Sequence, residues 1–473
     1  MRLMCDCLIW KSIRQKSWIW RPCFVRARLP PAIHFEPRQI AFGRRLWIWK
    51  SACRFVETCS KEAHGMARTS SLRPWAMVEA STASRAMHSP LLLIANARMP
   101  SQRAQSLQVA QASAALARAG APTTLWHARR RDTQELSSEA LFDHYAVPRG
   151  ERPAVEAISS LDWIDLVPRS LQFVPARCQE FSFAYNAARR ARRASEVTRV
   201  LTRETEVAGM LRGRPGLFIE MHRVPGHALR RRALIRAVEA GARVIAISGG
   251  VREDLLALGL SAESICVEHD GYESSRFESL PDKSAAREAM GLDLERPVVV
   301  YVGGLLAWKG VDVLVDAARR LPEVQFLIVG GMDRDVARLR KAAEGLRQVE
   351  ITGFVEPRRA AIALRAADIS VVPNLAAPAI SARYTSPLKI FEAMALGVPL
   401  VCSDLPSMRD VLDDSTAMFV PPGDSAALAE VLRDLLGDDS RMRAHGEALH
   451  ARAPEHTWDA RAQRILDWMG EQA

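Results

Sequence analysis

The sequence lacks any uninterrupted run of the roughly 18 apolar residues that a membrane-spanning helix needs. Cysteines are also scarce, with eight in 473 residues, and Cys5-x-Cys7 has no second pair at the spacing of zinc ligands. Cys178, Cys266 and Cys402 stand alone in the longer second part of the chain, which is typical of reduced thiols in a cytoplasmic protein. We therefore expect no spanning helix and no metal site.

Most of the chain also lacks an excess of positive charge. Residues 1–88 hold 16 Lys and Arg against 5 Asp and Glu, which leaves 49 of each kind from the totals of 65 and 54. The net charge of +11 therefore belongs to the first segment. The rest of the chain gives no electrostatic reason to expect a nucleic-acid partner.

Residues 1–88 are rich in Trp and Arg, and charges interrupt each of their apolar runs. The segment is therefore not a clean signal peptide. Our hypothesis is that much of this extension is not native protein and that translation starts at Met66, Met77 or Met87. The alternative is a basic, aromatic arm that contacts an anionic membrane.

The part from residue 89 to 275 opens with a βαβ pattern. We predict a strand at 90–97, a helix at 106–118 and a strand at 123–127. No G-x-G-x-x-G follows the first strand, which disfavours a nicotinamide or flavin cofactor. Ligands of parallel sheets bind at the carboxyl ends of the strands. The candidate contacts there are Arg98, Ser101, Gln102 and Gln105, with a plain solvated loop as the alternative.

Two further features of this part are candidates for function. A predicted strand ends at Glu220 and His222, and a neutral imidazole can donate to a phosphate or a hydroxyl oxygen. The alternative is an interior His with satisfied hydrogen bonds. After the strand at 243–248, the Gly249-Gly250 helix start could receive an anion or a hydroxyl. The basic stretch R-R-A-R-R within 185–199 suits either lipid phosphate or water.

The part from residue 276 to 455 repeats the alternation of strands and helices. After the strand at 297–302, Gly303 and Gly304 let the backbone approach a diphosphate, and Lys309 supplies a cation before the next helix.

The segment from Ser386 to Asp404 carries the densest pattern. We predict Ser386 as the N-cap, Pro387 as the first helical residue and Gly397 as the helix end, followed by a strand from 398 to 402. Lys389 and Glu392 then lie near the positive end of the helix. A cation there suits an anionic group, and a carboxylate one turn later can accept from sugar hydroxyls.

The helix S-P-L-K-I-F-E-A-M-A-L-G and the following V-P-L-V-C-S-D-L-P resemble the donor-binding segment of the family-4 retaining glycosyltransferases. The resemblance runs from about Pro90 to the C-terminus. It implies a GT-B α/β fold with two Rossmann-like domains facing a cleft. It also implies that backbone groups at 353–355 read the base of the donor and that the helix within 456–473 returns to the first domain. It also implies a nucleotide-diphosphate sugar as donor, retention at the anomeric carbon, and neither a metal nor another cofactor.

The resemblance assigns roles to residues of this chain. It implies that Glu392 binds the ribose of the donor and that His222 and Lys309 act beside the sugar and the diphosphate. The implied catalytic set is therefore His222, Lys309 and Glu392. The implied donor-binding set is Gly303, Gly304, Lys309, Gly353, Phe354, Val355, Ser386, Leu388, Lys389 and Glu392. The acceptor, a glycan or a lipid-linked intermediate, is assigned to Arg98, Ser101, Gln102 and Gln105.

The chain departs from the family pattern at two positions. Tyr384 stands where a second Glu is usual, and Gly304 stands where an Arg is usual, so Lys389 is our candidate for the missing charge. Two other functions stay open, a sugar-nucleotide 2-epimerase and a non-catalytic partner in polysaccharide synthesis. We expect a cytoplasmic protein with contact at the inner membrane face.

Overall fold

The computed structural model describes residues 88–470 except 102 and 132. The extension of residues 1–88, apart from its last residue, lies outside this range, as do the candidate starts Met66, Met77 and Met87. The candidate acceptor contact Gln102 also lies outside it.

The first lobe is built on a sheet of seven parallel strands. Its strands are β1 (Leu91–Arg98), β2 (Thr123–Ala128), β3 (Ala154–Ile158), β4 (Arg199–Thr202), β5 (Leu217–Met221), β6 (Arg243–Ala246) and β7 (Ile265–Val267). They are ordered β3-β2-β1-β4-β5-β6-β7, with Leu91 facing Thr123 on one side and Arg199 on the other. Apolar side chains pack on both faces of this sheet, as continuous apolar strands require.

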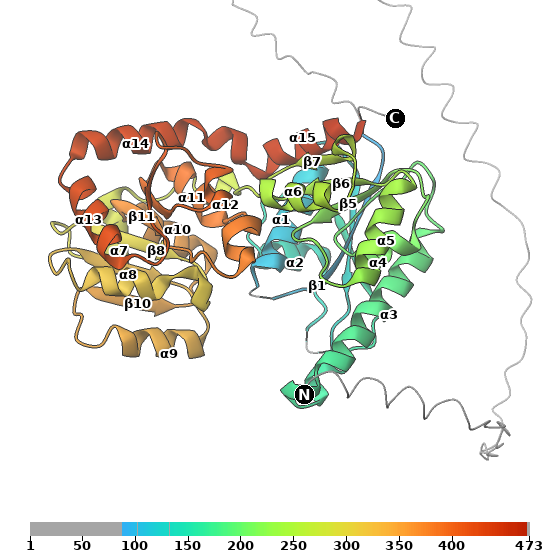
Figure 1. Cartoon of the computed structure of the whole chain (residues 1–473), viewed down its shortest axis with the longest axis horizontal. Helices are drawn as coiled ribbons and strands as arrows, with labels where there is room; N and C mark the ends of the chain where they lie inside the picture. Colours follow the sequence, from blue (N-terminus) through green and yellow to red (C-terminus); the bar gives the residue numbers. More distant parts are fainter. Residues whose placement is uncertain (1–87, 102, 132, 471–473) are drawn as a thin grey trace, which may run out of the picture. The chain divides into compact units, whose positions relative to one another are not determined.

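Helices connect these strands (Figure 1). The α-helices are α1 (Ala104–Arg118), α2 (Ser138–His144), α3 (Phe173–Ala191), α4 (Thr205–Met210), α5 (Ala228–Glu239) and α6 (Gly249–Ala257). The short 3-10 turns are η1 (Ile164–Leu166), η2 (Arg169–Leu171) and η3 (Ala262–Ser264).

The second lobe holds six parallel strands in the order β10-β9-β8-β11-β12-β13. They are β8 (Val298–Val302), β9 (Gln325–Val329), β10 (Val349–Gly353), β11 (Ile369–Val372), β12 (Leu400–Ser403) and β13 (Ala417–Val420). The α-helices are α7 (Lys283–Met290), α8 (Val311–Ala318), α9 (Asp333–Ala342), α10 (Pro357–Arg365), α11 (Leu388–Leu396), α12 (Pro406–Arg409), α13 (Ser425–Leu436) and α14 (Asp439–Ala451). The turns are η4 (Ser274–Arg276), η5 (Ala307–Lys309), the π-turn η6 (Ile380–Tyr384) and η7 (Ala453–His456). The predicted α/β class with two Rossmann-like sheets is confirmed.

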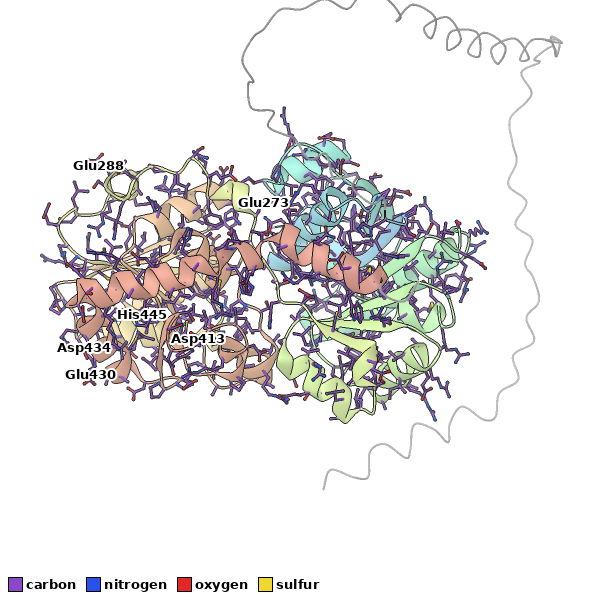
Figure 2. The ribbon with its side chains drawn as sticks, turned by 90° about the horizontal axis from the view of Figure 1, so that it is seen from above. Glu273, Glu288, Asp413, Glu430, Asp434 and His445 are labelled. Atoms are coloured by element: carbon purple, nitrogen blue, oxygen red, sulfur yellow. The ribbon has the colours of Figure 1, made fainter. Side chains whose placement is uncertain are left out.

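The last helix, α15 (Trp458–Gly470), packs against the first lobe although it follows the second lobe in sequence. Trp458 is buried there and donates from Nε1 to Gln111 Oε1 of α1 over 2.6 Å. Ile465 and Leu466 join the apolar core beside β1. In Figure 2, α14 and α15 follow one another as the long red ribbon that passes His445.

The structure corrects the predicted start of the 386–404 segment. Pro387 is the cap residue and α11 begins at Leu388. The Ser386 hydroxyl does not cap α11, because it accepts from the backbone N–H of Asp270 over 2.9 Å. Gly397 ends the helix with φ 62°, as expected, and β12 begins at Leu400, two residues later than predicted. None of the helices in the described residues is long and apolar enough to cross a membrane.

Candidate functional site

The carboxyl ends of β8 and β9 bring two glycine turns into close contact. Gly303 donates its N–H to the carbonyl of Val329 over 2.8 Å. Gly330 has φ 109°, and a Cβ built on it would lie 2.5 Å from the carbonyl oxygen of Gly303. A side chain at Gly330 would therefore displace the backbone of the neighbouring turn. The two turns leave bare backbone at the edge of the sheet where such folds bind ligands.

Lys389, in the first turn of α11, lies directly behind the Gly303 turn. Its ammonium lies 3.8 Å from the centre of the Tyr301 ring, and a Cβ on Gly303 would lie 3.4 Å from it. The side chain is buried, and Nζ has no hydrogen-bond partner among the described residues. A buried ammonium without a partner is costly, so this geometry favours an anion at the turn.

Lys309 is the second cation at this turn. It ends η5, and its Nζ lies 4.0 Å from the centre of the Trp308 ring. Burial lowers the pKa of Lys309 to about 8. Burial and the charge of Lys309 together hold the pKa of Lys389 well below its usual value. A bound diphosphate would favour the charged form of both lysines and would therefore raise both pKa values.

Glu392 lies one turn after Lys389 on α11. Its Oε1 accepts from Arg276 over 3.0 Å, and its charge also acts on Lys389. Arg276 belongs to η4, in the connection between the sheets, and the sequence analysis did not select it. Arg276 fixes the carboxylate, and Oε2 is the oxygen left for a hydroxyl group.

Apolar side chains are exposed around the same edge. Leu306, Met332 and Phe354 follow β8, β9 and β10, and more than half of each is exposed. Exposed apolar groups at the ends of three adjacent strands suit a flat base. Phe354 and the half-buried Val355 were predicted as donor contacts, whereas Leu306 and Met332 were not.

Three members of the predicted donor set remain to be placed. Gly304 is exposed, and its carbonyl accepts from the Tyr301 hydroxyl over 2.7 Å. Gly353 ends β10 with φ 80°, and its carbonyl accepts from Gly330 N–H over 2.8 Å. Leu388 packs instead against the apolar core of the first lobe. The predicted donor set is therefore brought together at one edge except for Ser386 and Leu388, which contact the first lobe or the connection.

Asn374 is a further polar residue at this edge that the sequence analysis missed. It follows β11, is fully buried, and has no partner for either side-chain amide atom among the described residues. The neighbouring Leu375 donates its N–H to the carbonyl of Trp308 over 2.9 Å. The only sequence signal was an amide residue just after an apolar strand.

His222 follows β5 in a network of charged groups in the first lobe. Its Nε2 lies 2.8 Å from Glu220 Oε1 and also meets the guanidinium of Arg203. Burial and Arg203 lower the pKa of His222, although Glu220 opposes them. The ring is therefore neutral near pH 7, and Nδ1 is the ring atom left for a ligand.

Glu220 is the centre of this network. Its carboxylate is buried and accepts from Arg203 over 2.7 Å and from Arg461 of α15 over 3.0 Å. Burial alone would raise the pKa of Glu220, but the two arginines outweigh it and hold the pKa well below its usual value. Neither arginine was predicted from the sequence, and Arg461 lies 241 positions from Glu220.

Asp270 links this network to α11. Its charge acts on His222, and its backbone N–H donates to Ser386 over 2.9 Å. Gly271 follows it closely, and a Cβ there would lie 2.7 Å from the carbonyl oxygen of His456. The region around His222 is therefore continuous with the start of the helix that carries Lys389 and Glu392.

The predicted acceptor contacts take different positions. Arg98, at the end of β1, forms an ion pair with Asp165 over 3.4 Å. Ser101 donates its N–H to the Tyr145 hydroxyl over 2.8 Å, and Gln105 is exposed on the first turn of α1. One turn further, Gln108 accepts from Arg203, which also meets His222. The start of α1 therefore lies beside the His222 network.

The Gly249-Gly250 helix start, predicted to receive an anion or a hydroxyl, already has partners within the protein. Gly249 donates its N–H to Asp410 over 2.8 Å, and a Cβ on Gly250 would lie 2.4 Å from the carbonyl oxygen of Arg383. Tyr384 binds Asp254 of α6 through its hydroxyl. Residues of the second lobe therefore contact the start of α6. Tyr384, which belongs to the second lobe, contacts the first lobe.

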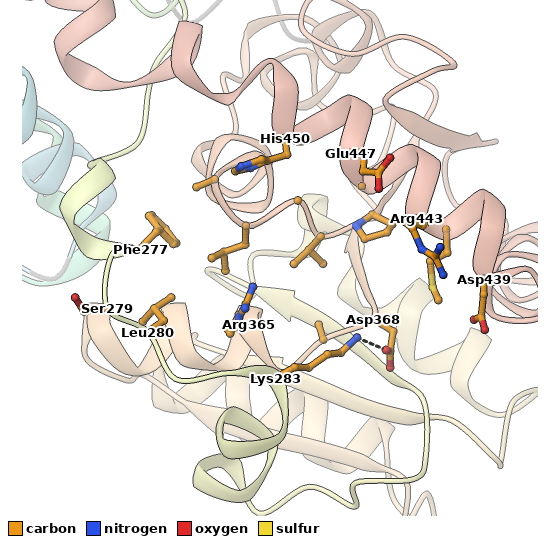
Figure 3. A pocket seen from close by; sticks show the side chains of 18 residues that line it. Phe277, Ser279, Leu280, Lys283, Arg365, Asp368, Asp439, Arg443, Glu447 and His450 are labelled. Carbon is orange, nitrogen blue, oxygen red and sulfur yellow. Dashed lines mark hydrogen bonds and ion pairs between the residues drawn. The ribbon is translucent and has the colours of Figure 1, made fainter.

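A cavity of about 740 Å³ lies elsewhere in the second lobe (Figure 3). Its lining includes Arg365, Arg443 and the ion pair of Lys283 with Asp368. The cavity is at the amino ends of β11 and β12, where Ala367 and Val398 precede the strands. Ligand sites of parallel sheets lie at the other edge, so this cavity is separate from the predicted site. Among residues 88–470 without the two gaps, no cluster of three or more His, Cys, Asp or Glu could hold a metal ion.

Comparison with protein families matches residues 296–438 to the model of the glycosyl transferases group 1. The chain is 31% identical over 246 residues to a D-inositol 3-phosphate glycosyltransferase of Xylanimonas cellulosilytica, covering 49% of this chain and 57% of the relative. It is 36% identical over 164 residues to the phosphatidyl-myo-inositol mannosyltransferase of Mycobacterium leprae, covering 33% and 42%. The chain thus spans about half the length of the curated relatives it matches.

Two solved structures resemble the whole two-lobed part. The Anabaena protein HepE in complex with UDP-glucose has a TM-score of 0.61 at 17% identity, covering 82% of this chain and 100% of that one. A sucrose-phosphate synthase from Thermosynechococcus elongatus has a TM-score of 0.62 at 21% identity, covering 80% and 97%. These likenesses show a GT-B fold.

Proposed function

Residues 296–438 match the model of the glycosyl transferases group 1, and on this premise we propose that the chain is a glycosyltransferase. It transfers a hexose from a nucleotide-diphosphate sugar to a glycan or lipid-linked acceptor with retention of anomeric configuration. The second lobe, over residues 276–455, binds the donor, and the first, over 89–275, binds the acceptor. The HepE structure contains UDP-glucose, which supports a donor of this class.

The observation that carries the proposal is the pair of lysines at the Gly303 turn. Lys389 is buried with no hydrogen-bond partner among the described residues, and the charge of Lys309 acts on it directly. Glycine backbone beside two lysines that form no ion pair with the described residues is a site for a diphosphate. Exposed Leu306, Met332 and Phe354 at the same edge suit the base.

Catalysis then follows from where charge develops. As the bond between the anomeric carbon and the diphosphate oxygen breaks, negative charge builds on the departing phosphate. Lys309 and Lys389 are already in place to stabilise that charge, so little reorganisation is needed during the reaction. Lys389 supplies the charge that an Arg at position 304 would otherwise provide.

The neutral ring of His222 contributes from the first lobe. Arg203 and Glu220 hold its Nε2 side, so Nδ1 can bond to a donor hydroxyl or phosphate oxygen. Glu392, fixed by Arg276, accepts from the ribose hydroxyls. Arg98, Ser101, Gln102 and Gln105 remain the proposed acceptor contacts.

Single substitutions test the proposal. Lys309→Ala should lower the rate of transfer roughly 10²–10³-fold, the loss typical of one preorganised charge, and Glu392→Ala should abolish donor binding. Lys341→Ala is the matched control, because Lys341 is an exposed lysine of α9 in the same lobe. Hydrolysis and transfer are measured with uridine, guanosine and adenosine diphosphate sugars.

Near-normal turnover in Lys309→Ala would contradict the site assignment. Donor binding seen by thermal shift, with no hydrolysis or transfer from any sugar nucleotide, would favour the non-catalytic binding partner instead. Inversion of a donor's C2 configuration would favour the epimerase.

A further inference from the structure

Exposed apolar side chains concentrate in one short segment of the first lobe. Among the described residues, fifteen large apolar side chains are exposed, and eight of them fall within residues 161–185. We call these eight the apolar ridge. Leu166, Leu171 and Phe173 are each at least 60% exposed. Figure 1 shows the start of α3 and the turns before it projecting below the first sheet. An exposed patch of this density marks an interaction surface.

Part of the apolar ridge lies on the outer face of α3. Val174, Phe181 and Tyr185 are exposed at helical spacings of seven and four residues, and Arg189 follows four residues later. The inner face of the same helix is already packed, because Phe183, Ala187 and Ala188 are buried in the core. The outer apolar face is therefore additional to what folding requires.

The charges beside the ridge leave a positive excess. Asp162, Asp165 and Glu180 are each paired with an arginine. Arg189, in the last turn of α3, and Arg193, two residues after its end, are exposed and form no side-chain hydrogen bond or ion pair with the described residues. Aromatic and apolar groups next to unpaired arginines match the interface of an anionic bilayer.

The ridge is attached to the proposed acceptor edge. Asp165 of η1 pairs with Arg98 at the end of β1 over 3.4 Å. Asn96 of β1 and Gln179 of α3 exchange two side-chain hydrogen bonds, of 3.2 and 2.9 Å. A molecule held at the end of β1 would therefore have the ridge beside it.

We propose that the apolar ridge rests in the interface of an anionic membrane and that the acceptor is lipid-linked. The polar headgroup of the acceptor reaches the end of β1, while its hydrocarbon stays in the bilayer against the ridge. This inference rests on the proposed function, because it names the acceptor class of the same site.

Vesicle flotation of the full chain tests the surface. The probes are vesicles of phosphatidylcholine alone and of phosphatidylcholine with phosphatidylglycerol. The chain should bind the anionic vesicles at least tenfold more tightly, and the double variant Phe181→Glu/Tyr185→Glu should lose at least tenfold of that binding. Leu294→Glu is the control, because Leu294 is an exposed leucine of the second lobe. The double variant Arg189→Glu/Arg193→Glu should lose the preference for anionic vesicles. It should keep the weaker binding to vesicles of phosphatidylcholine alone.

Hydrolysis of the sugar nucleotide by the Phe181→Glu/Tyr185→Glu variant, measured without lipid, should match the wild type. This second readout shows that the variant is folded and separates the two hypotheses. Wild-type vesicle binding that the ridge variants leave unchanged would overturn the membrane surface, whatever the catalytic result. A ridge variant that instead dissociates a dimer in solution would assign the ridge to a second copy and also overturn the proposal. Absence of both hydrolysis and transfer in the wild type would overturn the proposed function, and the flotation result would still stand.

Discussion

The two ligand edges of this molecule satisfy their polar groups in opposite ways. In the first lobe, His222, Glu220, Arg203 and Arg461 bond to one another, and the buried carboxylate has a partner on each oxygen. In the second lobe, Lys389 and Asn374 are buried without hydrogen-bond partners among the described residues. The first arrangement holds His222, the proposed catalytic side chain, in place. The second leaves polar groups that a bound ligand can satisfy.

The largest expected effect comes from opening the satisfied network. Arg461→Ala leaves Glu220 with one arginine fewer in a buried site, and breaking such a pair costs about 3–5 kcal/mol of unfolding free energy. It should also shift the pH profile of kcat, because Glu220 then acts differently on His222. Arg464→Ala on the same helix is the control, since its pair with Glu268 is partly exposed and should cost below about 1 kcal/mol. Equal losses of unfolding free energy in the two variants, measured by urea unfolding, would contradict the distinction between the buried and the partly exposed ion pair.

A smaller effect concerns protonation at the unsatisfied edge. The pKa of Lys309 is lowered to about 8, so the side chain is mostly neutral at higher pH. If the diphosphate binds the charged form, its binding there must be coupled to proton uptake from solution. Above pH 8, deprotonation of Lys309 should lower the affinity for a nucleoside diphosphate by up to about tenfold per pH unit. Calorimetry at pH 8.5 in buffers of different ionisation enthalpy should show net proton uptake. Lys309→Ala should lose the inflection near pH 8, and an unchanged inflection would contradict the assignment to Lys309.

The smallest effect is expected at the contact between α6 and the second lobe. Tyr384→Phe removes the hydroxyl that meets Asp254, but Arg383 still pairs with Asp254 and Glu253 over 2.9 Å. Because these groups are partly exposed, the change should cost below about 1 kcal/mol of unfolding free energy. Turnover should stay within about threefold of the wild type, corresponding to less than 1 kcal/mol in the barrier. A hundredfold loss of turnover would show that Tyr384 contacts the transferred sugar.

Much of the proposed donor site, at the carboxyl ends of β8 to β10, was predictable because its sequence signals are local. The apolar strand before Gly303 marks the end of a parallel strand. Lys309 marks the start of the next helix, and both signals fall within a dozen residues. The order of these units along the chain also predicted the two-sheet class. Local spacing sufficed because each unit forms its own strand, turn and helix start.

The partners of the predicted residues were not predictable in the same way. Arg461 lies 241 positions from Glu220, and Arg276 lies 116 positions from Glu392, so no spacing rule connects them. Ser386 shows the opposite failure, since a residue type that favours capping is used for a tertiary contact with Asp270. The start of α6 fails likewise, because Asp410 from a distant segment takes the N–H that the local pattern left free.

The most direct measurement compares the affinities of a nucleoside and its diphosphate for the wild type and for the Lys309→Ala/Lys389→Met variant. The account predicts that the diphosphate binds the wild type at least a hundredfold more tightly than the nucleoside, and that the double variant loses nearly all of this advantage. A double variant that retained the hundredfold preference would show that the diphosphate does not bind at the two lysines.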